Sequence, residues 1–190
     1  RIPSRQHLQK QLTAAAEIGA AGLIVHGGHV LATDDAAVGF DNWRKAIDGL
    51  SIDVPLLIEN TAGGANAMAR HLDRLAQLWD AISHSPNADK VGFCLDTCHA
   101  HAGGMELLGL VDRVRAITGR IDLVHANDSR DAFDSGADRH TNFGQGFCDP
   151  EGVAEVVATA GAPVVVETPG GVEGQRADLD WLASVTGPRG

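Results

Sequence analysis

The chain has 190 residues, 44% of them hydrophobic, which is enough to bury the core of one domain of ordinary size. Its formal net charge of −10 argues against nonspecific nucleic-acid binding along a basic face, although bound divalent cations would offset acidic charge locally. No apolar run approaches the ~20 residues of a membrane helix. Three cysteines and no signal segment favour a reducing, cytoplasmic setting. We expect one domain over residues 1–190.

Helical patterns alternate with short apolar runs along the whole chain. In a first helix over residues 4–18, Ser4 is the candidate N-cap and Gly19 the C-terminal stop. Further helices are expected over residues 36–50, 65–84, 106–118, 150–160 and 175–185. The clearest apolar spacing of three or four residues is that of Met68, Leu72, Leu75, Trp79 and Ile82. We interpret such stripes as core packing.

Five apolar runs between these helices predict β-strands: GLIVH, VPLLIE, VGFCLD, DLVH and PVVVE. Continuous apolar strands are typical of a parallel sheet that is buried on both faces. The repeated β-then-α order indicates an α/β barrel or a doubly wound sheet, and there is no G-x-G-x-x-G motif of a dinucleotide site. Polar residues at the carboxyl ends of successive strands favour the barrel. A closed TIM (β/α)8 barrel has eight strands and about 250 residues. We therefore expect an incomplete barrel of about five βα units, with about three more upstream.

Each predicted strand ends in a residue that could bind a metal: His26, Glu59, Asp96, His125 and Glu167. Three similar residues follow in the connecting segments: His99, Asp138 and His140. Side chains at the carboxyl ends of barrel strands converge on one face, and mixed imidazole and carboxylate ligands suit zinc or a similar first-row metal. Any one of these residues alone would more often be a cap or a surface group. The joint pattern favours a metal site.

Other residues near this predicted site carry weaker signals. For His29 and His101, contacts that support the ligands and plain loop roles are equally consistent with the sequence. Arg139 lies between two predicted ligands, where a phosphate contact and a surface salt bridge are equally consistent. Cys94 and Cys98 have a zinc-like spacing, but Cys94 falls inside a buried strand, so core packing is preferred for it.

Four stretches resemble, in the same order, the endonuclease IV family of apurinic/apyrimidinic (AP) endonucleases: IENTAGG, GFCLDTCHAHAGG, HANDSRDAFDSGADRHTNFGQG and VVVETP. The likeness covers nearly the whole chain. It implies a monomeric barrel of the xylose-isomerase-like type with three zinc ions, Mn²⁺ being an alternative in part of the sites. The implied reaction is hydrolysis of the phosphodiester 5′ to an abasic site, leaving a 3′-hydroxyl. The implied partner is duplex DNA with abasic or 3′-blocked sites, during base excision repair.

The resemblance also implies a role for each predicted ligand. Glu59 matches the catalytic carboxylate that bridges two zinc ions, and His26 would bind the first zinc beside it. The other family ligand of that zinc is a histidine upstream of this region. The remaining ligands of the second zinc would be Asp96, His125 and Glu167, and those of the third would be His99, Asp138 and His140. In such an enzyme, the phosphate contact considered above for Arg139 would be a contact with DNA.

Three positions depart from the family pattern. The sequence has HGGH, residues 26–29, where the family usually has H-P-G-S-H, so His26 keeps its place and the resemblance assigns no role to His29. Gln145 stands where a Glu is common, and His101 stands where a Phe is typical. None of these departures falls on an implied zinc ligand.

Two other functions remain open at this stage. A metal-dependent sugar isomerase or epimerase of the same barrel type would need only Glu59, Asp96, His125 and Glu167. The additional trio of His99, Asp138 and His140 distinguishes the nuclease, because an isomerase has no need of a third metal site. The second alternative is a catalytically silent fragment that still binds metal.

Overall fold

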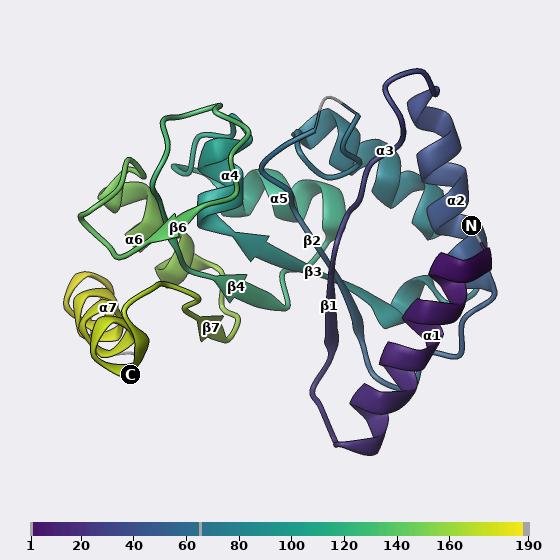
Figure 1. Cartoon of the computed structure of the whole chain (residues 1–190), viewed down its shortest axis with the longest axis horizontal. Helices are drawn as coiled ribbons and strands as arrows, with labels where there is room; N and C mark the ends of the chain where they lie inside the picture. The colour runs from purple at the N-terminus through teal and green to yellow at the C-terminus, as the bar shows by residue number, and fades with distance from the viewer. Residues whose placement is uncertain (1, 65, 188–190) are drawn as a thin grey trace.

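The computed structural model describes residues 2–64 and 66–187 and has an α/β fold built on a parallel sheet (Figure 1). Its five strands lie in the order β1-β2-β3-β4-β7. They are β1 (Leu23–His26), β2 (Leu56–Glu59), β3 (Val91–Asp96), β4 (Leu123–His125) and β7 (Val164–Val165). All five predicted strands are confirmed, and neighbours in this sheet follow one another along the chain, as in a barrel. The last strand is shorter than expected, so Glu167 lies beyond its end.

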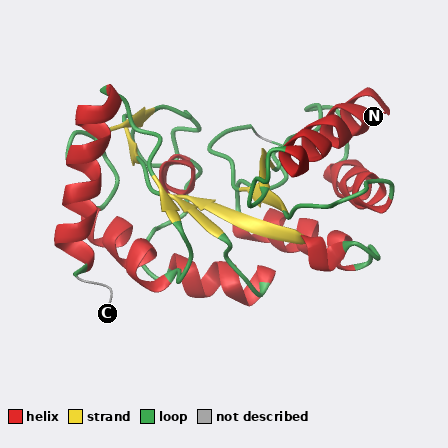
Figure 2. Cartoon of the chain, turned by 90° about the horizontal axis from the view of Figure 1, so that it is seen from below, coloured by secondary structure: helices red, strands yellow, loops and turns green. Residues whose placement is uncertain are grey.

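Helices precede, connect and follow the strands of the sheet and line one side of it (Figure 2). They are α1 (Ile2–Glu17), α2 (Ala36–Asp48), α3 (Leu72–Ser83), α5 (Leu110–Thr118), α6 (Pro150–Thr159) and α7 (Gly171–Thr186). A 3-10 turn, η1 (Ala88–Lys90), precedes β3. Contacts run from α2 to α3 to α5 to α6 to α7, so these helices form a continuous layer. None of the described helices is long and apolar enough to cross a membrane.

Local sequence signals account for several helix ends. Asp35 caps α2 by accepting a 2.9 Å hydrogen bond from the Ala37 N–H. Asp149 caps α6 in the same way, and Pro150 follows at the first helical position, where its missing N–H costs no hydrogen bond. Gly119 ends α5 with a φ of 72°, in the left-handed region that glycine adopts most readily.

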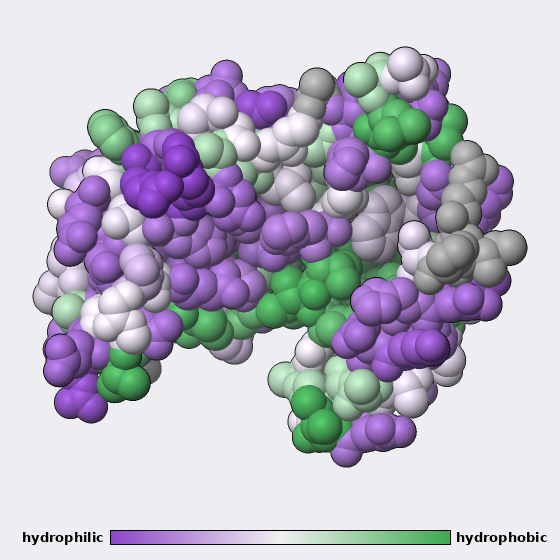
Figure 3. Space-filling model, in the orientation of Figure 1, coloured by the Kyte–Doolittle hydropathy of each residue, from purple (hydrophilic) through white to green (hydrophobic). Residues whose placement is uncertain are grey.

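The core lies between the sheet and this helical layer. Phe93 of β3 is fully buried, and its ring makes an edge contact with Trp79 of α3 at a centroid distance of 5.8 Å. Leu75 and Ile82 of the predicted stripe are buried beside it, which confirms the interpretation of that stripe as core. Apolar surface also gathers in the hollow between the α1 and α7 sides (Figure 3). Among the described residues, the edge strands β1 and β7 each pair on one side only.

Two predicted helices begin later than expected. The helix expected over 65–84 begins at Leu72; residue 65 lies outside the described residues, and 66–71 form turns. The backbone there bonds to neighbouring loops instead, since the Met68 N–H donates to the Gly28 carbonyl and the Ala69 carbonyl accepts from Thr61. The helix expected from residue 106 begins at Leu110, after Gly109 at a φ of 68°.

Besides η1, three short elements were not predicted, and one predicted cap was wrong. Helix α4 (Thr97–Ala102) follows β3 directly, and β5 (Asp128–Ser129) pairs antiparallel with β6 (His140–Thr141). Helix α1 already includes Ser4, so this residue is not its N-cap, whereas Gly19 follows the helix with a φ of 68°, as expected of a stop. The helix expected over 175–185 begins earlier, at Gly171.

Candidate metal centre

Strand register brings the strand-end residues together at one edge of the sheet. His26 of β1 is the register partner of Glu59 in β2, and Asp96 of β3 is the partner of His125 in β4. Since the strands are parallel, all four residues lie at carboxyl ends, the face on which barrel enzymes place their active sites. Glu167 reaches the same edge from the segment after β7.

Four of these residues form a compact group. One ligand atom each of Glu59, Asp96, His125 and Glu167 lies within 4.8 Å of the others. His125 Nδ1 is 2.8 Å from Glu59 Oε1 and 3.2 Å from Glu167 Oε2. Glu59 is 4% exposed and Asp96 is fully buried. Glu167 is partly exposed, but the two buried carboxylates beside His125 are costly to bury unless a cation compensates their charge.

A second set lies beside it, formed by His99, Asp138 and His140. Oδ1 of Asp138 is 3.0 Å from His99 Nε2 and 3.4 Å from His140 Nε2. Both Nε2 atoms are buried, and neither makes a hydrogen bond of acceptable geometry. The two imidazole rings are 5.5 Å apart, at centroids. Unsatisfied ring nitrogens facing a carboxylate are the arrangement that a bound metal would complete.

The carboxylates perturb the histidines of both sets. Burial by itself lowers the pKa of His99, but the carboxylates of Asp96, Asp138 and Glu59 outweigh burial and raise the pKa to about 9. Burial also lowers the pKa of His125, but the carboxylates of Glu59, Glu167 and Asp96 together outweigh burial and raise it. Contacts with His140 and His99 lower the pKa of Asp138. The site therefore has an excess of negative charge that attracts cations, whether protons or metal ions.

His26 completes the cluster on its open side. Its Nε2 lies 3.4 Å from Glu59 Oε2, and its ring makes an edge contact with His99 at 5.2 Å between centroids. The His26 side chain is 54% exposed, in contrast to the buried Glu59. Ligand atoms of His26, His99 and Asp138 also lie within 4.8 Å of one another. All eight predicted ligands are thus brought together.

Helix α4 and a buried amide hold the second set in place. The Asp96 carboxylate accepts a 2.7 Å bond from the His99 N–H, which caps this helix. Asn60 accepts from the Asp96 N–H and donates to the Asp96 carbonyl, at 2.8 and 2.9 Å. Its own carbonyl is 3.0 Å from His99 Nδ1 and can only accept the proton there, so Nε2 is the ring nitrogen that faces Asp138 and can bind a metal in place of its proton. Sequence reasoning missed Asn60, although it directly follows the strand-end Glu59.

The loop after β6 is organised by a second residue that sequence reasoning missed, Asp128. This carboxylate is 3% exposed and accepts four backbone N–H bonds of 2.8 to 3.1 Å. The donors are Ser129, Gly144, Gly146 and Cys148. Because β5 pairs with β6, the same segment also holds His140.

A backbone contact fixes the loop that carries Asp138. A Cβ added at Gly63 would lie 2.3 Å from the carbonyl oxygen of Gly136. Gly136 itself has a φ of 71°. The loops after β2 and β5 therefore touch where neither has a side chain.

The residues with weaker signals lie outside the two sets. Arg139 forms a double ion pair with Asp131, so the salt bridge exists; a phosphate contact stays a prediction. His101 is buried with Nε2 3.2 Å from the Asp131 carbonyl, and its ring packs against Phe133. His29 is exposed, and its backbone bridges to Ala67. Neither histidine belongs to a potential metal-binding group among the described residues.

All three cysteines are buried and free. Cys94 packs in the core strand, as expected, yet its sulfur lies within 4.8 Å of ligand atoms of Glu59 and His125. Cys98 lies similarly close to Asp96 and His140. Burial, reinforced by these acids, raises the pKa of both thiols, which favours their protonated form.

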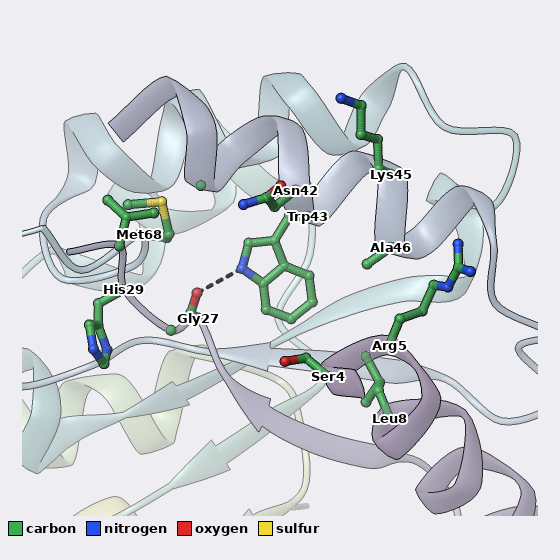
Figure 4. A pocket seen from close by; sticks show the side chains of 13 residues that line it. Ser4, Arg5, Leu8, Gly27, His29, Asn42, Trp43, Lys45, Ala46 and Met68 are labelled. Atoms are coloured by element: carbon green, nitrogen blue, oxygen red, sulfur yellow. Dashed lines mark hydrogen bonds between the residues drawn. The ribbon is translucent and has the colours of Figure 1, made fainter. Parts of the chain in front are cut away.

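A cavity of about 370 Å³ lies away from the cluster, between α1, α2 and the loop after β1 (Figure 4). Trp43 crosses it and donates a 2.7 Å hydrogen bond from Nε1 to the Gly27 carbonyl. Met68 and His29 line one end and Arg5 the other. None of the eight predicted ligands lines it.

Known proteins resemble this chain in sequence and in fold. Residues 1–185 match the family described as xylose isomerase-like TIM barrel. A probable endonuclease 4 of Mycobacterium ulcerans is 56% identical over 182 residues, covering 96% of this chain and 70% of that protein. Endonuclease IV from Thermus thermophilus superimposes with a TM-score of 0.77 at 29% identity, covering 96% of this chain and 67% of that one. A D-tagatose 3-epimerase-like protein, at 17% identity and a TM-score of 0.75, shares the fold alone, covering 97% of this chain and 70% of that one. With its strand-end cluster and these relatives, the chain belongs to the endonuclease IV family of xylose isomerase-like TIM barrels.

Proposed function

We propose that this chain acts as a zinc-dependent AP endonuclease in base excision repair. It would hydrolyse the phosphodiester 5′ to an abasic site in duplex DNA and leave a 3′-hydroxyl. The relatives named endonuclease 4 and endonuclease IV support the reaction class. The observation that carries the proposal is the set of His99, Asp138 and His140, with two buried ring nitrogens that lack hydrogen-bond partners. A sugar isomerase would not need this set.

The donor atoms of the cluster fit zinc. Imidazole nitrogens and carboxylate oxygens, with thiols protonated, form a set that zinc accepts and that Mn²⁺ can share in part. Glu59, Asp96, His125 and Glu167 would hold one zinc, and His99, Asp138 and His140 another. A further zinc would use His26 together with Glu59. Bound zinc would supply Lewis-acid stabilisation of the negative charge that develops on a phosphodiester under attack.

The residues of the chain then have distinct tasks. Glu59 is central, because one oxygen faces His125 at 2.8 Å and the other faces His26 at 3.4 Å, so its carboxylate joins two parts of the cluster. Arg139, half-exposed at the rim, would exchange its partner Asp131 for a DNA phosphate. An abasic nucleotide has no base to unstack, which lowers the cost of admitting it to this site. We propose that duplex DNA with abasic or 3′-blocked sites binds to a monomer.

Incision of a defined duplex tests the proposal. The chain is incubated with a duplex that carries one abasic site, with zinc, with chelator, and with chelator followed by excess zinc. We expect cleavage 5′ to the lesion, its loss on chelation and its return with zinc, and extension of the product by a polymerase as evidence of a 3′-hydroxyl.

Variants connect the result to the cluster. Asp138→Asn should abolish incision, whereas His7→Ala, which alters an exposed histidine outside the cluster, should leave it unchanged. The full-length Mycobacterium ulcerans relative serves as the positive control for the substrate. An intact duplex with zinc bound to the chain would contradict the nuclease and favour the silent metal-binding alternative. Conversion of a ketose sugar in place of incision would favour the isomerase.

A further inference from the structure

Asn127 lies, fully buried, between two of the proposed zinc ligands. Its side-chain Nδ2 donates a 2.7 Å hydrogen bond to Asp96 Oδ2. Its Oδ1 accepts a 2.8 Å bond from the backbone N–H of Glu167. The orientation of the amide is fixed by chemistry, because a carboxylate can only accept and a backbone N–H can only donate. The two ends of one side chain therefore contact two different ligands.

The bond to Glu167 continues the sheet beyond its last regular pair. The Ala126 N–H donates to the Val165 carbonyl, at 2.8 Å, and this is where the β4–β7 ladder ends. The next N–H along that edge, that of Glu167, is bound by the side chain of Asn127 instead of by a main-chain carbonyl. The position of Glu167, whose side chain is 45% exposed, thus depends on this amide.

The bond from Asn127 to Asp96 restricts rotation of the Asp96 carboxylate. Its Oδ1 accepts from the His99 N–H at 2.7 Å, and its Oδ2 accepts from Asn127, so rotation of the carboxylate would break a hydrogen bond. Asn127 is itself fixed by Thr97, whose hydroxyl bonds to the Asn127 carbonyl and N–H at 2.6 and 2.9 Å. The amide is a rigid spacer between the ends of β3 and β7.

We propose that Asn127 is a positioning residue that sets the separation and orientation of Asp96 and Glu167 for metal binding. The inference rests on the proposed function, since it concerns the same zinc-binding group. Groups that orient metal ligands in this way typically affect metal affinity by about 10- to 100-fold. If Asn127 had only a structural role, its replacement would lower zinc affinity only to the extent that it lowers the stability of the fold.

Two substitutions separate these roles. Asn127→Asp keeps the shape but places a second carboxylate against Asp96, and Asn127→Ala removes both bonds without adding charge. Asn87→Ala is the matched control, because the Asn87 amide also bonds to backbone, at Ile47 and Leu50, far from the cluster. Zinc affinity is measured by competition with a chromophoric chelator, and urea unfolding of the zinc-free proteins gives their stability.

For both Asn127 variants we expect zinc affinity to fall by about 10- to 100-fold. For Asn87→Ala we expect lower stability with unchanged zinc affinity. If Asn127→Asp does not fold, the zinc affinity of Asn127→Ala alone tests the positioning role. The positioning role is overturned if the zinc affinity of Asn127→Ala is within twofold of that of the unaltered chain. It is also overturned if Asn127→Ala loses no more zinc affinity than Asn87→Ala does. If the unaltered chain itself binds no zinc, the proposed metal site fails, and the role of Asn127 with it.

Discussion

Replacement of Asp128 tests how much of the fold depends on one buried carboxylate. Asp128→Ala removes the acceptor of the long-range bonds from Gly144, Gly146 and Cys148, at 3.1, 3.0 and 2.9 Å. Each bond to a charged acceptor contributes about 1.5 kcal/mol net, so the free energy of unfolding should fall by roughly 3–5 kcal/mol. With a urea m-value of about 2 kcal/mol/M, the midpoint should shift down by about 2 M.

Asp128→Asn sharpens the test because it keeps the size of the side chain. One end of the amide can still accept from Cys148 and Ser129, but the other end places an NH₂ group against the N–H groups of Gly144 and Gly146. We expect a loss of roughly 2–3 kcal/mol and faster hydrogen exchange at these two glycines. Asp89→Asn, at an exposed position, is the control and should change stability by less than about 0.5 kcal/mol. Equal midpoints for Asp128→Asn and the unaltered chain would refute the reasoning.

Three further predictions concern the metal, the core and DNA. Zinc at about 1,000 times its dissociation constant should stabilise the chain by about 4 kcal/mol, and chelation should remove this gain in a thermal melt; an unchanged melt would count against a folded-state metal site. Phe93→Ala should lower the free energy of unfolding by about 3–5 kcal/mol and alter Trp79 fluorescence. A smaller loss would mean that neighbouring side chains fill the space that the Phe93 ring leaves. Arg139→Ala should weaken DNA binding and reduce the magnitude of the salt-dependence slope by about 1, whereas Arg176→Ala on α7 should not; equal slopes would exclude a phosphate contact at Arg139.

The sequence predicted the sheet well because its strands are uninterrupted apolar runs bounded by polar residues. It failed where local pattern and tertiary contacts disagree. Met68 keeps the helical apolar spacing of the residues after it, yet its N–H bonds to Gly28, so the helix starts only at Leu72. β5 and β6 have two residues each, too few for any period to be visible.

The ligands were predictable for a different reason. Residues at the ends of parallel strands converge whatever the details of packing, so their meeting followed from topology. Their supports did not, because Asn60 and Asn127 act through hydrogen bonds that no spacing encodes. The only available signal was their place in the sequence, one residue after Glu59 and two residues after His125.

The contact between Gly63 and Gly136 has a consequence for mutational tolerance. The Gly136 carbonyl occupies the place where a methyl group at residue 63 would lie, and Asp138 follows on the same loop. Backbone cannot swing aside as a flexible side chain can, so even alanine at residue 63 would move the carboxylate away from His99. The most restrictive positions around this centre therefore include two that carry no functional group, and a search confined to reactive side chains would overlook them.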